Sequence, residues 1–186
     1  MTREQLEHAI RAAGAICGDR ELYIVGSQAI LGAHRNAHPD LLRSMEVDVA
    51  PKNRPELESV IEGSIGELSP FHKTFGFHVD GVDISGIVLP ADWQQRVVVV
   101  DNDNTNGYRG LCLDPADLAV SKLAAGRTKD LDFVRVMLRE RLVHAEILHV
   151  RIDTLSSLDE ARRIALHDLV TRLVSGRTSP RPRPSR

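Results

Sequence analysis

The stretch 23–51 constrains the fold of this chain more than any other. It opens with the short apolar run 23–25, which predicts a strand, and Gly26 and Ser27 then form a turn into an apolar helix. After a loop, a second predicted strand alternates between apolar residues and the acids Glu46 and Asp48. Because successive residues of a strand point to opposite faces, the two carboxylates share one face.

Two carboxylates side by side repel each other unless a cation lies between them. A divalent metal, Mg²⁺ or Mn²⁺, is the usual solution because hard cations take oxygen ligands. The start of the helix offers backbone N–H groups and a partial positive charge, which suit an anion. We therefore predict a metal–nucleotide site in which Gly26 and Ser27 hold phosphate and Glu46 and Asp48 hold metal. Each motif alone is also common as a plain turn or an exposed acidic pair, so the hypothesis depends on their combination.

A third carboxylate could come from a predicted hairpin further along the chain. Segments 77–79 and 82–89 have the pattern of strands, and Asp80 and Gly81 between them form a strong two-residue turn signal. On the second strand, Asp83 could lie beside the acidic pair as a metal ligand and as a base for an attacking hydroxyl. It could equally be exposed at the sheet edge, and Asp80 is assigned to the turn.

The segment 121–130 is the second informative stretch, and it spans the end of one predicted helix and the start of the next. Lys122, between apolar residues, is either an ordinary surface lysine or a lysine aimed at a triphosphate. Asp130 lies in a first helical turn, where the helix dipole favours an acid, so it either caps that helix or belongs to the site. Arg127 and Lys129 at the junction could contact phosphate or the acids.

The order of the predicted elements indicates an α/β (α+β) fold, in which a mixed sheet flanked by helices is followed by an all-helical part. We expect a core over 1–113, a helical C-terminal subdomain over 114–175 and a disordered basic tail over 176–186. Further helices are expected at 2–17, 54–67, 116–125, 129–141, 145–155 and 158–173, strands at 97–100 and 108–113, and an irregular segment at 71–76.

The composition is that of an ordinary globular protein, with 42% apolar and 27% charged residues. The net charge of −2 includes four arginines in the last twelve residues, so the remainder carries 20 minus 26, or −6. Such an acidic body argues against a general nucleic-acid binder but is compatible with a local basic groove.

Cysteine and histidine usage predicts a cytoplasmic protein without a zinc site. Cys17 and Cys112 lack metal-ligand spacing and are expected to be reduced and buried, and the eight histidines form no known ligand pattern. The charged N-terminus and the lack of a long apolar run predict neither a signal peptide nor a membrane span.

The order of these motifs resembles the polymerase-β-type nucleotidyltransferase superfamily. Residues 25–29 and 43–48 are similar to its hG[GS]…[DE]h[DE] signature, and 121–131 resembles the lysine and Arg/Lys-Asp motifs of the AbiEii-like branch, which includes the MenT toxins. The resemblance covers roughly residues 20–140, and its order and spacing are more specific than any single motif. This chain departs from the usual pattern in its first acid, Glu46, and in the long gap before it.

The resemblance implies a metal-dependent transferase that uses a nucleoside triphosphate and adds nucleotides to the 3′ end of tRNA. It also implies a cognate antitoxin protein as partner. The roles that it implies place Gly26, Ser27, Arg43 and Lys122 at the nucleotide, Glu46 and Asp48 at the metal, and Glu46, Asp48, Lys122 and Asp130 in catalysis. Asp83, from the strand pattern above, is added to the expected metal ligands. Two-metal transfer is the expected mechanism.

Other functions remain open at this point. The same site could transfer AMP to a protein hydroxyl or a nucleotide to a small molecule. A degenerate domain could instead only bind a nucleotide or a partner, or the arginine tail alone could bind RNA.

Overall fold

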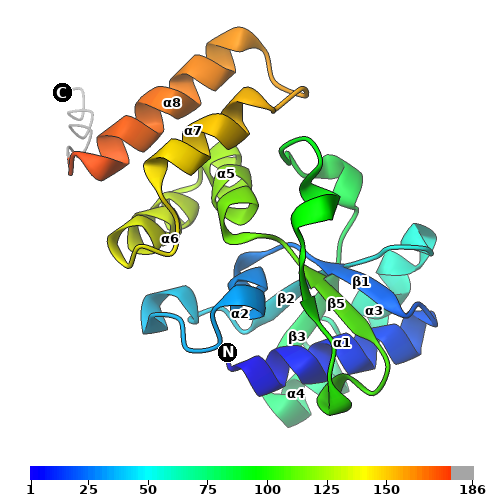
Figure 1. The fold of residues 1–186 in the computed structure, drawn as a ribbon. Helices are drawn as coiled ribbons and strands as arrows, with labels where there is room; N and C mark the ends of the chain where they lie inside the picture. Colours follow the sequence, from blue (N-terminus) through cyan, green and yellow to red (C-terminus); the bar gives the residue numbers. More distant parts are fainter. Residues whose placement is uncertain (177–186) are drawn as a thin grey trace, which may run out of the picture.

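The computed structural model describes residues 1–176, and its centre is a mixed five-stranded sheet (Figure 1). The strands are β1 (Glu21–Ile24), β2 (Glu46–Pro51), β3 (His78–Gly81), β4 (Val98–Val100) and β5 (Arg109–Cys112), in the order β3-β2-β1-β5-β4. β1 pairs antiparallel with β2 and parallel with β5, while β2 and β3 are parallel and β4 and β5 are antiparallel. The predicted α/β class with a mixed sheet is confirmed.

One face of the sheet is covered by α1 (Arg3–Cys17) and α3 (Glu58–Ile65), which pack on each other and on β2 and β3. Val47 and Val49 are fully buried, whereas Glu46 and Asp48, which alternate with them, are partly exposed. The alternation predicted for β2 is therefore confirmed, and it directs the two carboxylates away from the packed face.

A short helical run follows β1 directly, as the Gly26–Ser27 turn predicts. It consists of the 3₁₀ turn Ser27–Ala29 and of α2 (Ile30–Ala33). The loop after it contains a second 3₁₀ turn, Pro39–Leu41, which brings the chain to β2.

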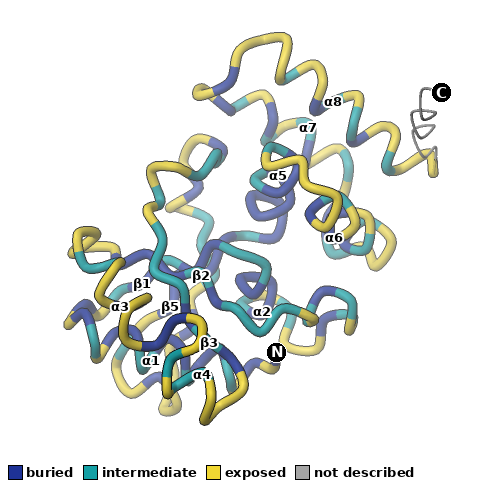
Figure 2. Tube along the Cα trace, turned by 180° about the vertical axis from the view of Figure 1, so that it is seen from behind, coloured by how far each residue is buried: buried dark blue, intermediate teal, exposed yellow. Residues whose placement is uncertain are grey.

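The C-terminal part is helical and consists of α5 (Pro115–Ala125), α6 (Thr128–Arg139), α7 (Ala145–Asp153) and α8 (Glu160–Val174). Asp114 caps α5 with its carboxylate and Pro115 occupies the first turn, while Gly126 ends the helix in the left-handed region at φ 67°. α5 is the most buried of the four and packs between α6 and α7, whereas α8 is largely exposed (Figure 2).

The predicted division after residue 113 falls one residue beyond the end of the last strand, Cys112, but the division into subdomains stays a prediction. Of the tail predicted over 176–186, residues 177–186 lie outside the described residues. Within the part of the chain that is described, no helix has the length and apolarity needed to cross a bilayer.

The predicted hairpin over 77–89 is wrong. Asp80 and Gly81 are the last residues of β3, which pairs in parallel with β2, and 82–89 is not a strand. The glycine serves close packing instead of a turn, because a Cβ on Gly81 would lie 1.9 Å from the carbonyl oxygen of Glu58 in α3.

The prediction that segment 71–76 is irregular is also wrong, because most of it is helical. It forms α4 (Pro70–Phe75), whose cap is Ser69, since the Ser69 hydroxyl accepts a hydrogen bond from the His72 N–H at 3.1 Å. Gly76 ends α4 at φ 72°. A Ser-Pro start and a Gly end are recognised helix signals that the sequence already contained.

A buried ion cluster attaches the helical part to the sheet part. The Asp117 side chain on α5 is fully buried, and Arg96 donates to both of its oxygens, through Nε at 2.8 Å and Nη2 at 3.0 Å. Arg151 from α7 places its Nε 3.2 Å from the same carboxylate. Burial raises the pKa of Asp117, and the two arginines oppose that rise. The cluster therefore fixes α5 and α7 against the loop before β4.

Candidate active site

A cavity of about 960 Å³ lies between the sheet and the C-terminal helices. Its lining includes Gly26, Ser27, Arg43, Glu46, Asp48, Lys122 and Asp130. Apart from Asp83, every site residue predicted from the sequence therefore lines one cavity, although segments 26–48 and 122–130 are far apart in the chain.

Gly26 and Asp48 are packed directly against each other at the edge of this cavity. A Cβ on Gly26 would lie 1.4 Å from Asp48 Oδ2, which no real structure tolerates. The adjacent backbone is joined as well, since the Val25 N–H donates to the Asp48 carbonyl oxygen at 3.1 Å. The glycine is thus required here by the carboxylate behind it and not by an unusual φ angle.

The surroundings of Asp48 disfavour its charged form. Burial is the largest cause, the nearby Glu46 and Asp80 carboxylates add to it, and Lys122 opposes it, so that the pKa of Asp48 is raised to about 7. A cation placed among these groups would reverse the balance. This cluster of hard oxygen donors is the chemistry that a divalent metal such as Mg²⁺ fits.

The raised pKa of Asp48 predicts a pH dependence of stability in the metal-free protein. Between the ordinary pKa of 3.8 and about 7, the folded state keeps a proton that the unfolded state has lost. The free energy of unfolding should therefore decrease as the pH rises through this range. Urea titrations between pH 4.5 and 7.5 with a chelator present measure it. Asp48→Asn should flatten the decrease, and an identical slope in the variant would contradict the assignment.

The structure reveals a further pair of candidate residues on β3, His78 and Asp80. In the parallel pairing of β2 and β3, Glu46 is in register with His78 and Asp48 with Asp80. Ligand atoms of Glu46, His78 and Asp80 all lie within 4.8 Å of one another. Burial raises the pKa of Asp80, His78 opposes that rise, and Glu46, Glu62 and Glu67 add to it. The alternation of polar and apolar residues over 78–80 was the sequence signal for this face, and the turn assignment concealed it.

Asp83, by contrast, is not part of the site in this structure. It precedes the 3₁₀ turn Ile84–Gly86, where its carboxylate accepts hydrogen bonds from the Ser85 N–H at 2.8 Å and the Ser85 hydroxyl at 2.6 Å. These bonds lower the pKa of Asp83, which lies outside the cavity lining. Asp80, on the strand next to the pair, occupies the place expected for Asp83.

The helical wall of the cavity contributes cations. Lys122 Nζ donates to Asp130 Oδ1 at 3.0 Å and lies 4.7 Å from the centroid of the Phe133 ring, while Arg127 Nε donates to Asp130 Oδ2 at 2.6 Å. Burial alone would raise the pKa of Asp130, but the hydrogen bonds from Arg127 and Lys122 outweigh it and lower the pKa. The Asp130 carboxylate therefore fixes the positions of the Lys122 and Arg127 side chains.

Further cations lie at the cavity wall. Arg43 forms an ion pair with Asp40 and its side chain is 79% exposed, and Arg127 is 63% exposed. Lys129 also lines the cavity. These exposed cationic side chains are placed to form ion pairs with an anionic substrate that enters from solvent.

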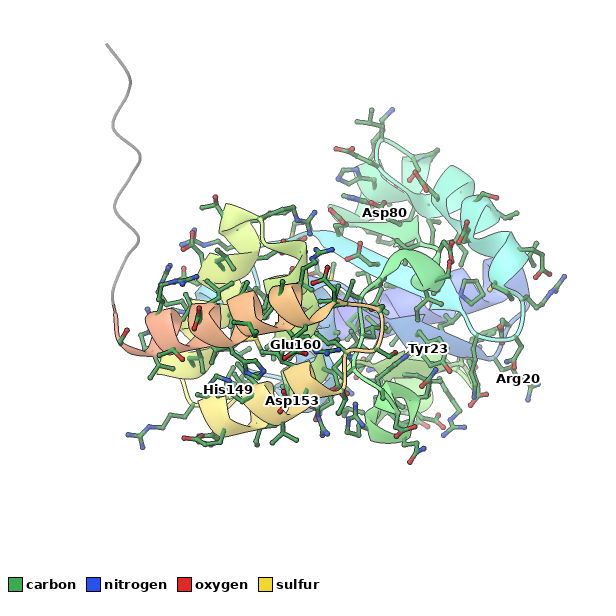
Figure 3. The ribbon with its side chains drawn as sticks, turned by 90° about the horizontal axis from the view of Figure 1, so that it is seen from above. Arg20, Tyr23, Asp80, His149, Asp153 and Glu160 are labelled. Atoms are coloured by element: carbon green, nitrogen blue, oxygen red, sulfur yellow. The ribbon has the colours of Figure 1, made fainter. Side chains whose placement is uncertain are left out.

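One histidine cluster lies outside this cavity, on the helical part. His149 and His167 stack with their Nδ1 atoms 2.7 Å apart, and His167 Nε2 lies 2.9 Å from Asp153 Oδ1. Figure 3 labels His149 and Asp153 on α7, away from Asp80 on the sheet part. The cluster links α7 to α8.

A comparison with protein families gives one match. The family described as "Nucleotidyltransferase of unknown function (DUF6036)" matches residues 4–174. The chain has no match among curated proteins or among solved structures. The matched region runs from α1 to the end of α8, so it includes both walls of the cavity.

Proposed function

Since this chain belongs to the nucleotidyltransferase family that it matches over residues 4–174, we propose that its cavity transfers a nucleotide from a nucleoside triphosphate to an acceptor hydroxyl with the help of a divalent metal. One observation carries this proposal. The carboxylates of Glu46 and Asp48 and the ammonium group of Lys122 line the same cavity and are close enough to influence one another electrostatically.

Each wall of the cavity has a separate task in this proposal. Glu46 and Asp48, with Asp80 beside them, would hold the Mg²⁺ or Mn²⁺. When bound, such a metal neutralises phosphate oxygens and lowers the pKa of a coordinated hydroxyl. Gly26 leaves room for the Asp48 carboxylate, and Ser27 would contact the triphosphate.

Lys122 and Arg127 would donate to phosphate oxygens as negative charge shifts towards the leaving pyrophosphate. Their shared partner, Asp130, holds both groups before the nucleotide arrives, so that little reorganisation accompanies the reaction. Asp130 then acts as a positioning residue and not as an acid or a base. Arg43, exposed at the wall, would contact the outer phosphates or the acceptor.

We further propose that the acceptor is the 3′ end of tRNA and that the protein is the toxin of a toxin–antitoxin pair acting in the cytoplasm. The resemblance of the motif order to the AbiEii-like branch supports this, as do the exposed cations at the cavity. Transfer to a protein or small-molecule hydroxyl is the alternative that would use the same residues. A domain that only binds a nucleotide or a partner would not need the full set of acids and cations.

A transfer assay tests the function directly. The purified chain is incubated with each of the four α-labelled NTPs and Mg²⁺, with tRNA, with tRNA whose 3′ diol has been oxidised by periodate, or with RNA-depleted lysate. We expect label on intact tRNA from one preferred NTP and none on oxidised tRNA. Label on protein alone would reject the tRNA acceptor. No transfer to any acceptor, by protein that is folded by circular dichroism, would reject the enzyme.

Gly26→Ala should reduce transfer at least about tenfold, because the new methyl group must displace the Asp48 carboxylate. The loss should be seen in the rate of a single turnover at saturating Mg²⁺. Gly63→Ala is the matched control, since a Cβ on Gly63 meets nothing within 4 Å, and it should leave the rate unchanged. Equal rates for the two variants would contradict the close packing of Gly26 on Asp48.

A further inference from the structure

Two histidines from different helices meet in the helical part of the molecule, and neither of them lines the cavity. His149 on α7 and His167 on α8 have nearly parallel rings, at 17°, and their Nδ1 atoms lie 2.7 Å apart. Asp153, one turn after His149 on α7, has its Oδ1 2.9 Å from Nε2 of His167. Figure 3 labels His149 and Asp153 on their shared helix. We call these three residues the α7–α8 histidine cluster.

The contacts of His167 assign its hydrogen. An ionised carboxylate only accepts hydrogen bonds, so Nε2 of His167 carries the hydrogen that Asp153 accepts. In the neutral ring, Nδ1 of His167 then has a free lone pair, which faces Nδ1 of His149. A carboxylate on the outer nitrogen is the usual support of a metal-bound histidine, because it fixes the tautomer and makes the ligating nitrogen more basic. His167 is therefore held in the state of a ligand.

The two Nδ1 atoms are close enough to share one ion. Imidazole nitrogens bound to one metal at about 2.1 Å are roughly 3.0–3.4 Å apart, so rotation of the two side chains has to separate them by less than about 1 Å. Among residues 1–176, no third His, Cys, Asp or Glu offers a ligand atom within 4.8 Å of both. The His167 side chain is 29% exposed, so water has access to the remaining coordination positions.

We propose that Nδ1 of His149 and Nδ1 of His167 bind one divalent transition metal ion, with Asp153 supporting His167 at its outer nitrogen. Imidazole suits Zn²⁺, Ni²⁺ and Cu²⁺, whereas Mg²⁺ prefers oxygen ligands. The site shares no residue with the cavity, so it goes beyond the proposed transfer reaction and does not depend on it. Spacing along the chain does not reveal it, because the two ligands are 18 residues apart on separate helices.

The ion would fasten α8 to α7. Of the 15 residues of α8, only Leu166 and Val170 are buried, so apolar packing holds this helix over a small area. His167 directly follows Leu166, and a metal bound there would cross-link the two helices. An ion that binds only the folded state raises the thermal midpoint by mass action.

The test is a titration of the full chain with Zn²⁺, followed by calorimetry and by the thermal midpoint, with excess Mg²⁺ present to compete for the carboxylates of the cavity. The wild type should bind a Zn²⁺ ion and gain thermal stability. His149→Gln and His167→Gln should each weaken this binding at least about tenfold. In proton NMR, Ni²⁺ should broaden two imidazole signals, one of which is absent from each variant. Asp153→Asn, which keeps both ligands, should weaken Zn²⁺ binding about tenfold.

His144→Gln is the matched control, because His144 is exposed just before α7 and its side chain does not cap that helix. This variant should bind Zn²⁺ as the wild type does. Retained tight Zn²⁺ binding in His149→Gln and His167→Gln would overturn the proposal, as would equal losses in His144→Gln. A wild type whose midpoint does not respond to Zn²⁺ would leave only a hydrogen bond between the two rings. Asp153→Asn still tests the site if a histidine variant fails to fold, and an unchanged affinity there would contradict the support given to His167.

Discussion

Replacing Asp48 with asparagine should lower nucleotidyl transfer by about a thousandfold or more while the protein stays folded. The Asp48 carboxylate lies among Glu46, Asp80 and Lys122, where the charged form is disfavoured until a cation arrives. Asparagine keeps the shape but cannot supply the charge that holds a metal. The rate of a single turnover at saturating NTP and Mg²⁺ measures the loss.

The same substitution should not destabilise the metal-free protein at pH 7.5. Because the pKa of Asp48 is raised to about 7, the neutral side chain is the form that this environment favours. The thermal midpoint of Asp48→Asn should therefore equal or exceed that of the wild type in the presence of a chelator. A variant that loses activity because it unfolds would contradict the catalytic interpretation.

Asp83→Asn is the control for this experiment. Its side chain faces Ser85 outside the cavity, so transfer should stay within about twofold of the wild type. A large loss of transfer in Asp83→Asn would return the third acid to the position first expected from the sequence. Asp80→Asn should then be tested in parallel.

Asp117→Ala should lower the free energy of unfolding by about 3–5 kcal/mol, the largest stability effect that we expect. The Asp117 carboxylate is fully buried, accepts hydrogen bonds from Arg96 at 2.8 Å and 3.0 Å, and forms an ion pair with Arg151, whose Nε lies 3.2 Å away. Removing it leaves two guanidinium groups without their shared anion in a mostly buried place. Urea denaturation followed by circular dichroism measures the change.

Asp132→Ala serves as the comparison for Asp117, because Asp132 pairs with Arg135 at the surface and its side chain is 61% exposed. Solvent screens such a pair, so its loss should cost no more than about 0.5 kcal/mol. Similar losses in both variants would show that the Asp117 cluster does not fasten the helices to the sheet part.

Local signals in the sequence predicted much of this fold. The helices expected at 2–17 and 116–125 are α1, which begins with a Thr2–Gln5 capping box, and α5, which Asp114 caps. These predictions succeeded because the interactions that decide them lie within four residues of one another. The strand that carries Glu46 and Asp48 was equally clear, since one buried face enforces the alternation over 46–49.

The hairpin prediction failed because it depends on contacts between distant segments, whereas α4 was missed although its Ser-Pro start and Gly end are local signals. Asp80 and Gly81 have the ideal composition of a hairpin turn, yet β3 ends there because α3 needs the space above Gly81 and β2 offers a parallel edge. Register between β2 and β3 is not encoded within either strand, so the proximity of His78 to Glu46 could not be derived locally. The role of Asp130 as a partner of Lys122 also depends on how α5 and α6 pack together.

The buried Asp117 cluster has one more consequence, for the order in which the chain becomes competent. Glu46 and Asp48 come from the segment made first, which also carries Arg43, whereas Lys122 and Arg127 come from helices made some seventy residues later. Until those helices dock through Asp117, the acids of the sheet part lack Lys122 and Arg127 opposite them, so that this part should attract a metal more readily than a triphosphate. An incompletely folded or truncated chain is therefore expected to be inactive in transfer, because it lacks the wall that we propose to receive the nucleotide.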